Sequence, residues 1–215
     1  MIREAKRKDL EYKRNSIVEL AKYLTAFPTI NIFDQVREIV GDGISELNEE
    51  DDGDLQMKPM YLHFKAIANQ SRLLLRANLY SLASAGFQPA IDPDRVQNAL
   101  WIVNLFNAEI PIATVWSTRI AICKAAQTFI TKCIITPTLT FPPEAVSSLW
   151  QSLKIVAGDR GYESVRSAAA KTVAEFVEWV ERHPEWVQVQ QQIRSELPGI
   201  IEAETSSVIQ AEYKR

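Results

Sequence analysis

The stretch Arg166-Ser167-Ala168-Ala169-Ala170-Lys171-Thr172-Val173 decides the fold, because its pattern of an arginine followed by small and aliphatic residues occurs twice earlier in the chain. The earlier copies are Arg76-Ala77-Asn78-Leu79-Tyr80-Ser81-Leu82-Ala83 and Arg119-Ile120-Ala121-Ile122-Cys123-Lys124-Ala125-Ala126. The arginines are 43 and 47 residues apart, and arrays of stacked helix pairs repeat every ~40–47 residues. We therefore predict a solenoid of antiparallel helix pairs.

The arginine has a physical role in such a repeat. Near the start of the second helix of a pair, it can hydrogen-bond the carbonyls or a carboxylate of a neighbouring turn, and small residues after it let helices approach closely. Arg119 and Arg166 should then do equivalent structural work. The pattern, above all Ser164-Val165-Arg166-Ser167-Ala168-Ala169-Ala170, resembles the HEAT family. An irregular helix bundle that contains three such arginines by chance is the alternative.

The composition predicts an all-α protein. The 215 residues include only seven Gly and ten Pro, and helix formers dominate. Asp92 should cap a helix that starts at Pro93, Pro111 should open the next one, and Pro198-Gly199 should split the last pair. Together with apolar spacing, these signals predict about four pairs, with helices at about 3–26, 32–47, 59–85, 92–106, 111–134, 143–157, 161–182, 185–196 and 199–212.

The chain should form a single α-helical repeat domain over residues 1–215, with two interruptions. Six carboxylates in residues 46–54 repel one another, so we expect residues 48–56 to be an acidic loop insertion. Three prolines within residues 136–143 predict a linker between repeats. Because the sequence enters a helical pattern directly, we expect Met1 to begin a fragment of a longer solenoid.

Charge and cysteine content limit the partners and the compartment. The 24 Lys+Arg against 27 Asp+Glu give a net charge of −3, which provides no general attraction for nucleic acid or an anionic bilayer. No apolar run reaches the ~20 residues of a membrane span. Cys123 and Cys133 are too far apart along one helix for a disulfide. These features favour a cytoplasmic or nuclear protein with reduced thiols.

No set of residues assembles a catalytic, cofactor or metal site. His63 and His183 are far apart in sequence and lack metal-ligand spacing. The segment Gly41-Asp42-Gly43 lacks the remaining elements of a phosphate loop, so we interpret it as a weakened or interrupted helix end. The acidic run lacks the alternating ligands of a calcium loop. We therefore expect no enzyme activity.

Protein binding is the expected role, through cations on the inner helices of the repeats. A row of this kind favours a partner with an acidic surface. The row consists of Arg72, Arg76, Arg119, Lys124, Arg166 and Lys171. Trp101, Trp116, Trp150 and Trp179 lie in predicted helices and should belong mostly to the core, whereas Trp186 should be exposed and is a candidate contact.

The order of features along residues 3–180 resembles the C-terminal region of the proteasome-associated HEAT-repeat adaptor and scaffold family. These features are a basic helical start, a Phe-Pro break, the Phe33-Asp34-Gln35-Val36 helix, an acidic insertion and then the arginine repeats. The resemblance implies tethering or quality control of the proteasome. Nuclear transport receptors and scaffolds of microtubules, phosphatases or condensin are alternatives within HEAT proteins. A helical nucleic-acid or membrane module, and a divergent helical enzyme, are alternatives outside them.

Overall fold

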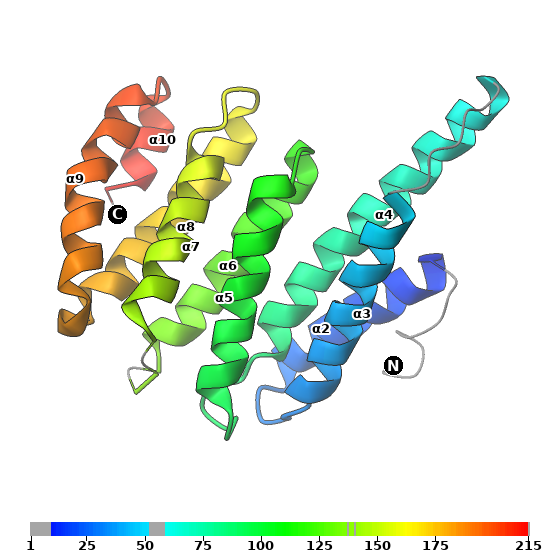
Figure 1. Cartoon of the computed structure of the whole chain (residues 1–215), viewed down its shortest axis with the longest axis horizontal. Coiled ribbons are helices and arrows are strands. Elements are labelled where there is room, and N and C mark those ends of the chain that lie inside the picture. Colours follow the sequence, from blue (N-terminus) through cyan, green and yellow to red (C-terminus); the bar gives the residue numbers. More distant parts are fainter. Residues whose placement is uncertain (1–9, 52–58, 137, 140, 215) are drawn as a thin grey trace. The chain divides into compact units, whose positions relative to one another are not determined.

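The computed structural model describes residues 10–51, 59–136, 138–139 and 141–214. Within them the chain consists of helices and contains no strand, which confirms the all-α prediction (Figure 1). The helices form two compact units, Met1–Gly86 and Phe87–Arg215. None of the helices described is long and apolar enough to cross a membrane.

The first unit is organised around the long helix α4 (Pro59–Gly86). Helices α2 (Leu10–Ala26) and α3 (Phe33–Asp51) both pack on it. Helix α2 packs mainly on α4 and not on α3, which follows it in the sequence. The buried Lys13 on α2 nevertheless reaches Glu46 on α3, with 2.5 Å between Nζ and Oε2.

Two glycines allow α3 and α4 to approach closely. A Cβ atom on Gly43 would lie 2.8 Å from Cδ1 of Leu79, and one on Gly86 would lie 2.8 Å from Cγ2 of Val36. Helix α3 runs through Gly41-Asp42-Gly43 without interruption, so the expected helix end is wrong. Packing against α4 compensates the low helix propensity of glycine there.

The first part of the predicted acidic loop is helical. Helix α3 continues to Asp51, so residues 48–51 are helical, and residues 52–56 lie outside the described part of the chain. Two contacts hold the end of this helix: Leu47 is buried, and Oδ1 of Asn48 accepts a 2.6 Å hydrogen bond from Arg76 of α4. Tertiary anchoring thus overrides the mutual repulsion of the carboxylates.

The second unit consists of two helix layers (Figure 1). One layer contains α5 (Arg95–Ile112), α7 (Pro143–Ala157) and α9 (Val187–Ala203). The other contains α6 (Trp116–Ile134), α8 (Glu163–Glu181) and α10 (Ser207–Glu212), and the short helix η1 (Pro184–Trp186) precedes α9. The pairs α5–α6, α7–α8 and α9–α10, with α3–α4 of the first unit, confirm the predicted solenoid of about four pairs.

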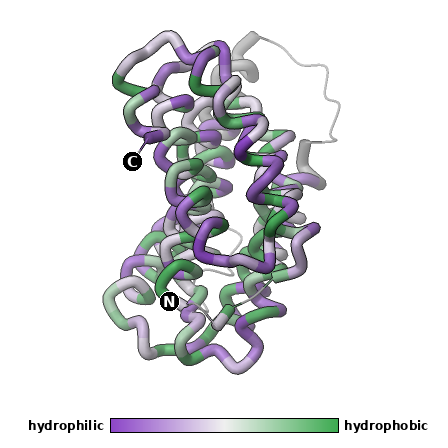
Figure 2. Tube along the Cα trace, turned by 90° about the vertical axis from the view of Figure 1, so that its left-hand side faces the viewer, coloured by the Kyte–Doolittle hydropathy of each residue, from purple (hydrophilic) through white to green (hydrophobic). Residues whose placement is uncertain are grey.

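Aromatic side chains fill the core between these layers. Trp150 of α7 stacks on Phe176 of α8, with ring centroids 6.0 Å apart, and Trp179 meets Phe176 edge-on at 5.9 Å. Cys123 and Cys133 are buried and free, and burial raises the pKa of the Cys123 thiol to about 12. Hydrophobic and hydrophilic residues alternate along the helices, as amphipathic packing requires (Figure 2).

Two helix boundaries between α4 and α6 differ from the prediction. Helix α5 begins at Arg95, and Asp92 instead closes the preceding turn, because its carboxylate accepts hydrogen bonds from Asp94 N (3.0 Å) and Asn98 Nδ2 (2.8 Å). Pro111 lies in the last turn of α5 and does not open α6. A proline near the end of a helix disturbs few of its hydrogen bonds.

The last pair is also divided elsewhere than expected. Pro198 and Gly199 lie inside α9, which continues to Ala203. Pro198 removes the hydrogen bond to the carbonyl of Arg194, but both residues are exposed, so water can solvate that carbonyl. Proline therefore does not end the helix, and α10 begins only at Ser207.

Candidate protein-binding surface

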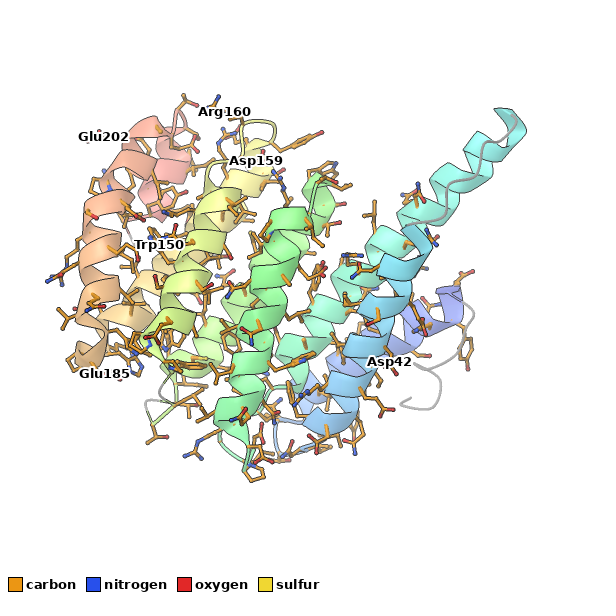
Figure 3. The ribbon with its side chains drawn as sticks, viewed as in Figure 1. Asp42, Trp150, Asp159, Arg160, Glu185 and Glu202 are labelled. Atoms are coloured by element: carbon orange, nitrogen blue, oxygen red, sulfur yellow. The ribbon has the colours of Figure 1, made fainter. Side chains whose placement is uncertain are left out.

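Arg119 is the fourth residue of α6 and links two repeats. Its Nε donates to the carbonyl of Ala113 at 2.7 Å, and its Nη1 forms a charge-assisted hydrogen bond with the carboxylate of Asp159. Ala113 precedes α6, whereas Asp159 lies in the connection between α7 and α8 (Figure 3). The guanidinium thus joins the start of its own helix to the next helix pair.

Arg166, the fourth residue of α8, makes the equivalent contacts one repeat later. Its Nη1 donates to the carbonyl of Asp159 at 3.2 Å, and its Nε donates to Oε2 of Glu204 at 2.8 Å. Glu204 lies between α9 and α10. The predicted equivalence of Arg119 and Arg166 is confirmed, and we call Arg119, Asp159, Arg166 and Glu204 the arginine–carboxylate ladder.

Asp159 and Glu204 also accept backbone hydrogen bonds within the connecting segments in which they lie. Oδ1 of Asp159 accepts hydrogen bonds from the N–H groups of Gly161 and Tyr162, both at 2.8 Å. Burial opposes ionisation of Asp159, but the hydrogen bonds from Tyr162, Arg119 and Gly161 more than offset it and hold its pKa below the usual range. The carboxylate is therefore ionised at neutral pH and serves as a fixed acceptor.

Glu204 is built in the same way. Its Oε1 accepts a 2.9 Å hydrogen bond from Ser206 N. Burial opposes its ionisation, yet the hydrogen bonds from Arg166 and Ser206 lower its pKa. The equivalent of the ladder arginines in α10 is Gln210, again the fourth residue of its helix, which donates from Nε2 to the carbonyl of Glu204 at 2.7 Å.

Arg72 and Arg76 do not take part in this arrangement. Both are half-buried residues of α4 in the first unit. Arg76 lies in the second half of the 28-residue helix and donates to Asn48 of α3. Its alignment with Arg119 and Arg166 is therefore wrong in structural terms, because those two arginines sit in the first turn of their helices.

Lys124 and Lys171 form the exposed part of the predicted cation row. Each lies five residues after a ladder arginine, and both are exposed. The hydrogen bond from Thr172 Oγ1 to the carbonyl of Cys123, at 3.0 Å, brings the neighbouring turns of α8 and α6 together. We call the exposed residues around them the second-helix face. It comprises Lys124, Thr128, Thr131, Lys171 and Glu178.

The expectation of an exposed Trp186 is wrong, since only 1% of the residue is accessible. Its ring stacks on His183, with centroids 4.1 Å apart, and meets Trp179 at 5.0 Å. Its indole Nε1 donates to the carbonyl of Phe141 at 3.1 Å. Helix η1 turns the side chain inward, and a hydrogen-bonding partner there removes the usual cost of burying the indole N–H.

Trp116 is the exposed tryptophan instead. It begins α6 with 46% of its surface accessible, and Tyr162, at 49%, lies beside it with ring centroids 6.2 Å apart. The pair borders the ladder, because Arg119 follows Trp116 by one helical turn. The apolar residues near Trp116 in the sequence predicted a core position for it. This prediction is wrong, because Trp116 is the first residue of α6 and no described residue covers much of its ring there.

A cavity of about 650 Å³ lies beside the ladder, between the α7–α8 and α9–α10 connections. Its lining includes Arg166 and Glu204, which bind each other, and Lys154 and Glu196, whose charged atoms are 2.8 Å apart. The hydrogen bond from Lys154 is the main reason that the pKa of Glu196 is lowered. These charges neutralise one another, so the cavity presents no poised acid, base or nucleophile.

Sequence reasoning missed the ladder acids and Gln210. Asp159 and Glu204 are 45 residues apart, so a search for carboxylates at the arginine spacing could have found them. Gln210 carries no charge and could be recognised only by its place in the helix. Among the residues described, no group of three or more His, Cys, Asp or Glu side chains could hold a metal ion. The side chain of His63 is outside the described set.

Comparison with known proteins adds one match. The family model of the ECM29 C-terminal ARM-like repeats matches residues 1–215. Searches of curated proteins and of solved structures found no match.

Proposed function

The chain belongs to the family of the ECM29 C-terminal ARM-like repeats, and we propose from this premise that it binds a protein partner through its second-helix face without catalysing a reaction. ECM29 is a proteasome-associated HEAT-repeat scaffold. The proposed partner is accordingly an acidic surface of the proteasome, and the role is tethering or quality control of that complex. Such a role belongs in the cytoplasm or the nucleus.

The recurrence of Lys124 and Lys171 carries this proposal. They occupy the same position in consecutive repeats and are exposed, and no described residue forms an ion pair with either of them. Arg119 and Arg166, by contrast, are bound to Asp159 and Glu204 and serve the fold. The ammonium groups are thus the part of the predicted row that is available to a partner, and complementary charge increases both specificity and association rate.

The absence of enzyme activity is also part of the proposal. His183 lies in the core beneath Trp186, with its Nδ1 2.8 Å from Oε1 of Glu185. Burial keeps Cys123 protonated, since it raises the pKa of the thiol to about 12. Neither group combines access with an activated form, so the scaffold role is the better explanation of the described side chains.

Charge reversal tests the proposal. The double variant Lys124→Glu/Lys171→Glu should bind purified proteasomes about tenfold more weakly, equivalent to about 1.4 kcal/mol, with unchanged circular dichroism. The control Lys22→Glu/Arg37→Glu makes the same charge change on exposed residues of the first unit and should bind like the native chain. Unchanged binding by the first variant would place the contact elsewhere, whereas absence of binding by the native chain would refute the proteasome as partner.

A further inference from the structure

Two features that the second-helix face does not use adjoin the connection between α7 and α8. One is the exposed pair of Trp116 and Tyr162, whose ring centroids are 6.2 Å apart. The other is the cavity of about 650 Å³ between this connection and the α9–α10 connection. Arg160 lines the cavity and belongs to the same connection as Tyr162, where Figure 3 shows it next to Asp159. The aromatic pair and the cavity are therefore parts of one surface.

The ladder holds the aromatic pair in place. The backbone N–H of Tyr162 donates to Oδ1 of Asp159 at 2.8 Å, and Arg119, one turn after Trp116, binds the other oxygen of the same carboxylate. The polar groups of the two rings, however, are unused: neither the indole N–H of Trp116 nor the hydroxyl of Tyr162 bonds to a described residue. A fixed aromatic surface with two available hydrogen-bonding groups is thus presented to solvent.

The charges around the cavity leave one cation unmatched. Each acid that lines the cavity has a cationic partner, and the three pairs are Arg119–Asp159, Lys154–Glu196 and Arg166–Glu204. Arg160 is exposed and forms no ion pair with a described residue. Because both walls of the cavity are described repeats, this guanidinium lies at a formed site. It favours an acidic group on whatever enters there.

We propose that this surface binds an extended, proline-containing segment of a partner protein, with a proline on the Trp116–Tyr162 pair and an acidic side chain beside Arg160. Proline rings pack on aromatic side chains, and the backbone of a polyproline II segment keeps its carbonyls free to accept hydrogen bonds from the indole N–H and the phenol. A ligand that uses both parts of the surface must be apolar at one point, acidic at another and carry acceptors between them, as a peptide does.

The described chain does not supply such a segment itself. Every described proline that has an acidic residue within three positions lies in a turn, in a helix or at the start of a helix. A second copy of the chain would therefore have to unfold one of these elements in order to bind. A separate partner is the occupant that the structure favours.

The distance between the two contacts sets the spacing in the peptide. Tyr162 and Arg160 are two residues apart, so their Cα atoms are separated by at most about 7 Å. A polyproline II segment rises about 3.1 Å per residue. The acidic residue should therefore lie two or three positions from the proline. The proposal does not depend on the lysines of the second-helix face.

Three labelled peptides test the surface in the full chain. The matched peptide has a central pair of prolines and glutamates two and three positions away on both sides, so that the direction of binding does not matter. In the second peptide glutamines replace the glutamates, and in the third serines replace the prolines. Fluorescence anisotropy should show binding of the matched peptide, at least threefold weaker binding of the glutamine peptide and at least fivefold weaker binding of the serine peptide.

Variants of the chain locate the binding. Trp116→Ala should weaken the matched peptide at least fivefold and Arg160→Gln at least threefold, with unchanged circular dichroism because both residues are exposed. Phe27→Ala and Arg194→Gln, which alter an exposed aromatic residue and an exposed cation elsewhere, should leave binding unchanged. Arg160→Gln should not affect the glutamine peptide, because that peptide has no charge for Arg160 to pair with.

Several outcomes would overturn the proposal. They are absence of binding by the matched peptide, equal binding of the matched peptide and either altered peptide, and equal effects of Arg160→Gln and Arg194→Gln or of Trp116→Ala and Phe27→Ala. It is also overturned if the native chain alone forms a dimer that Trp116→Ala abolishes, because the occupant is then a second copy.

Discussion

Removal of the Arg166 side chain is the most direct test of the ladder. In the variant Arg166→Ala, Glu204 loses two guanidinium contacts, at 2.8 and 3.4 Å, and the carbonyl of Asp159 loses one at 3.2 Å. The carboxylate of Glu204 remains buried, with only 3% of its side chain accessible. Its one remaining hydrogen bond of those described comes from the N–H group of Ser206. An ionised group is thus left without its counter-charge.

The expected cost follows from that burial. Removing one partner of a fully buried ion pair costs about 3–5 kcal/mol. Because 20% of the Arg166 side chain is accessible, water reduces the loss, and we expect about 2–3 kcal/mol. For a chain of this size, 1 kcal/mol corresponds to about 2–4 °C, so the melting temperature should fall by roughly 4–12 °C.

The assay is thermal and urea unfolding followed by tryptophan fluorescence, because Trp150 and Trp179 lie in the core of this unit. Arg182→Ala is the matched control. Arg182, the residue that directly follows α8, pairs with Glu178 at 2.5 Å, but both side chains are more than half exposed, so the loss should be about 0.3–0.5 kcal/mol. Equal effects of the two variants would refute the structural role of the ladder. A double variant Arg166→Met/Glu204→Met that is no more stable than Arg166→Met would also refute it.

Two further predictions concern the acids of the ladder and the close helix contacts. Because the pKa values of Asp159 and Glu204 are lowered in the folded chain, their contribution to stability is complete above the unfolded-state pKa of about 4 and is lost as the pH falls through the folded-state values. Urea titrations between pH 7 and pH 3 should show this loss, and Asp159→Asn should reduce its slope; an unchanged slope would exclude Asp159 as a source. Gly86→Ala should destabilise the chain by about 1–3 kcal/mol because the new Cβ would lie 2.8 Å from Val36. Gly41→Ala, which meets no atom within 4 Å, should stabilise it by up to about 1 kcal/mol, and the opposite order in thermal unfolding would contradict the described packing of α3 on α4.

Local patterns predicted most of the helices because they depend on neighbouring residues. The range 143–157 agrees with α7, and 59–85 differs from α4 by one residue. Prolines were the weaker guide. Pro111 and Pro198 lie inside helices, since packing along the rest of each helix outweighs one lost hydrogen bond. The power of the acidic run to end the helix was also overestimated, because the contacts of Leu47 and Asn48 anchor the end of α3.

The sequence by itself determined the helical class, the repeat and the equivalence of Arg119 and Arg166. These features depend on the spacing of apolar residues and of the arginines along the chain, which the sequence shows directly. It could not determine which carboxylates receive these arginines, since Asp159 and Glu204 lie 40 and 38 residues away. Tertiary structure also decided the exchange of roles between Trp116 and Trp186. Whether an aromatic residue is exposed depends on what packs against it, and the neighbours of Trp186 include Phe141, 45 residues earlier in the chain.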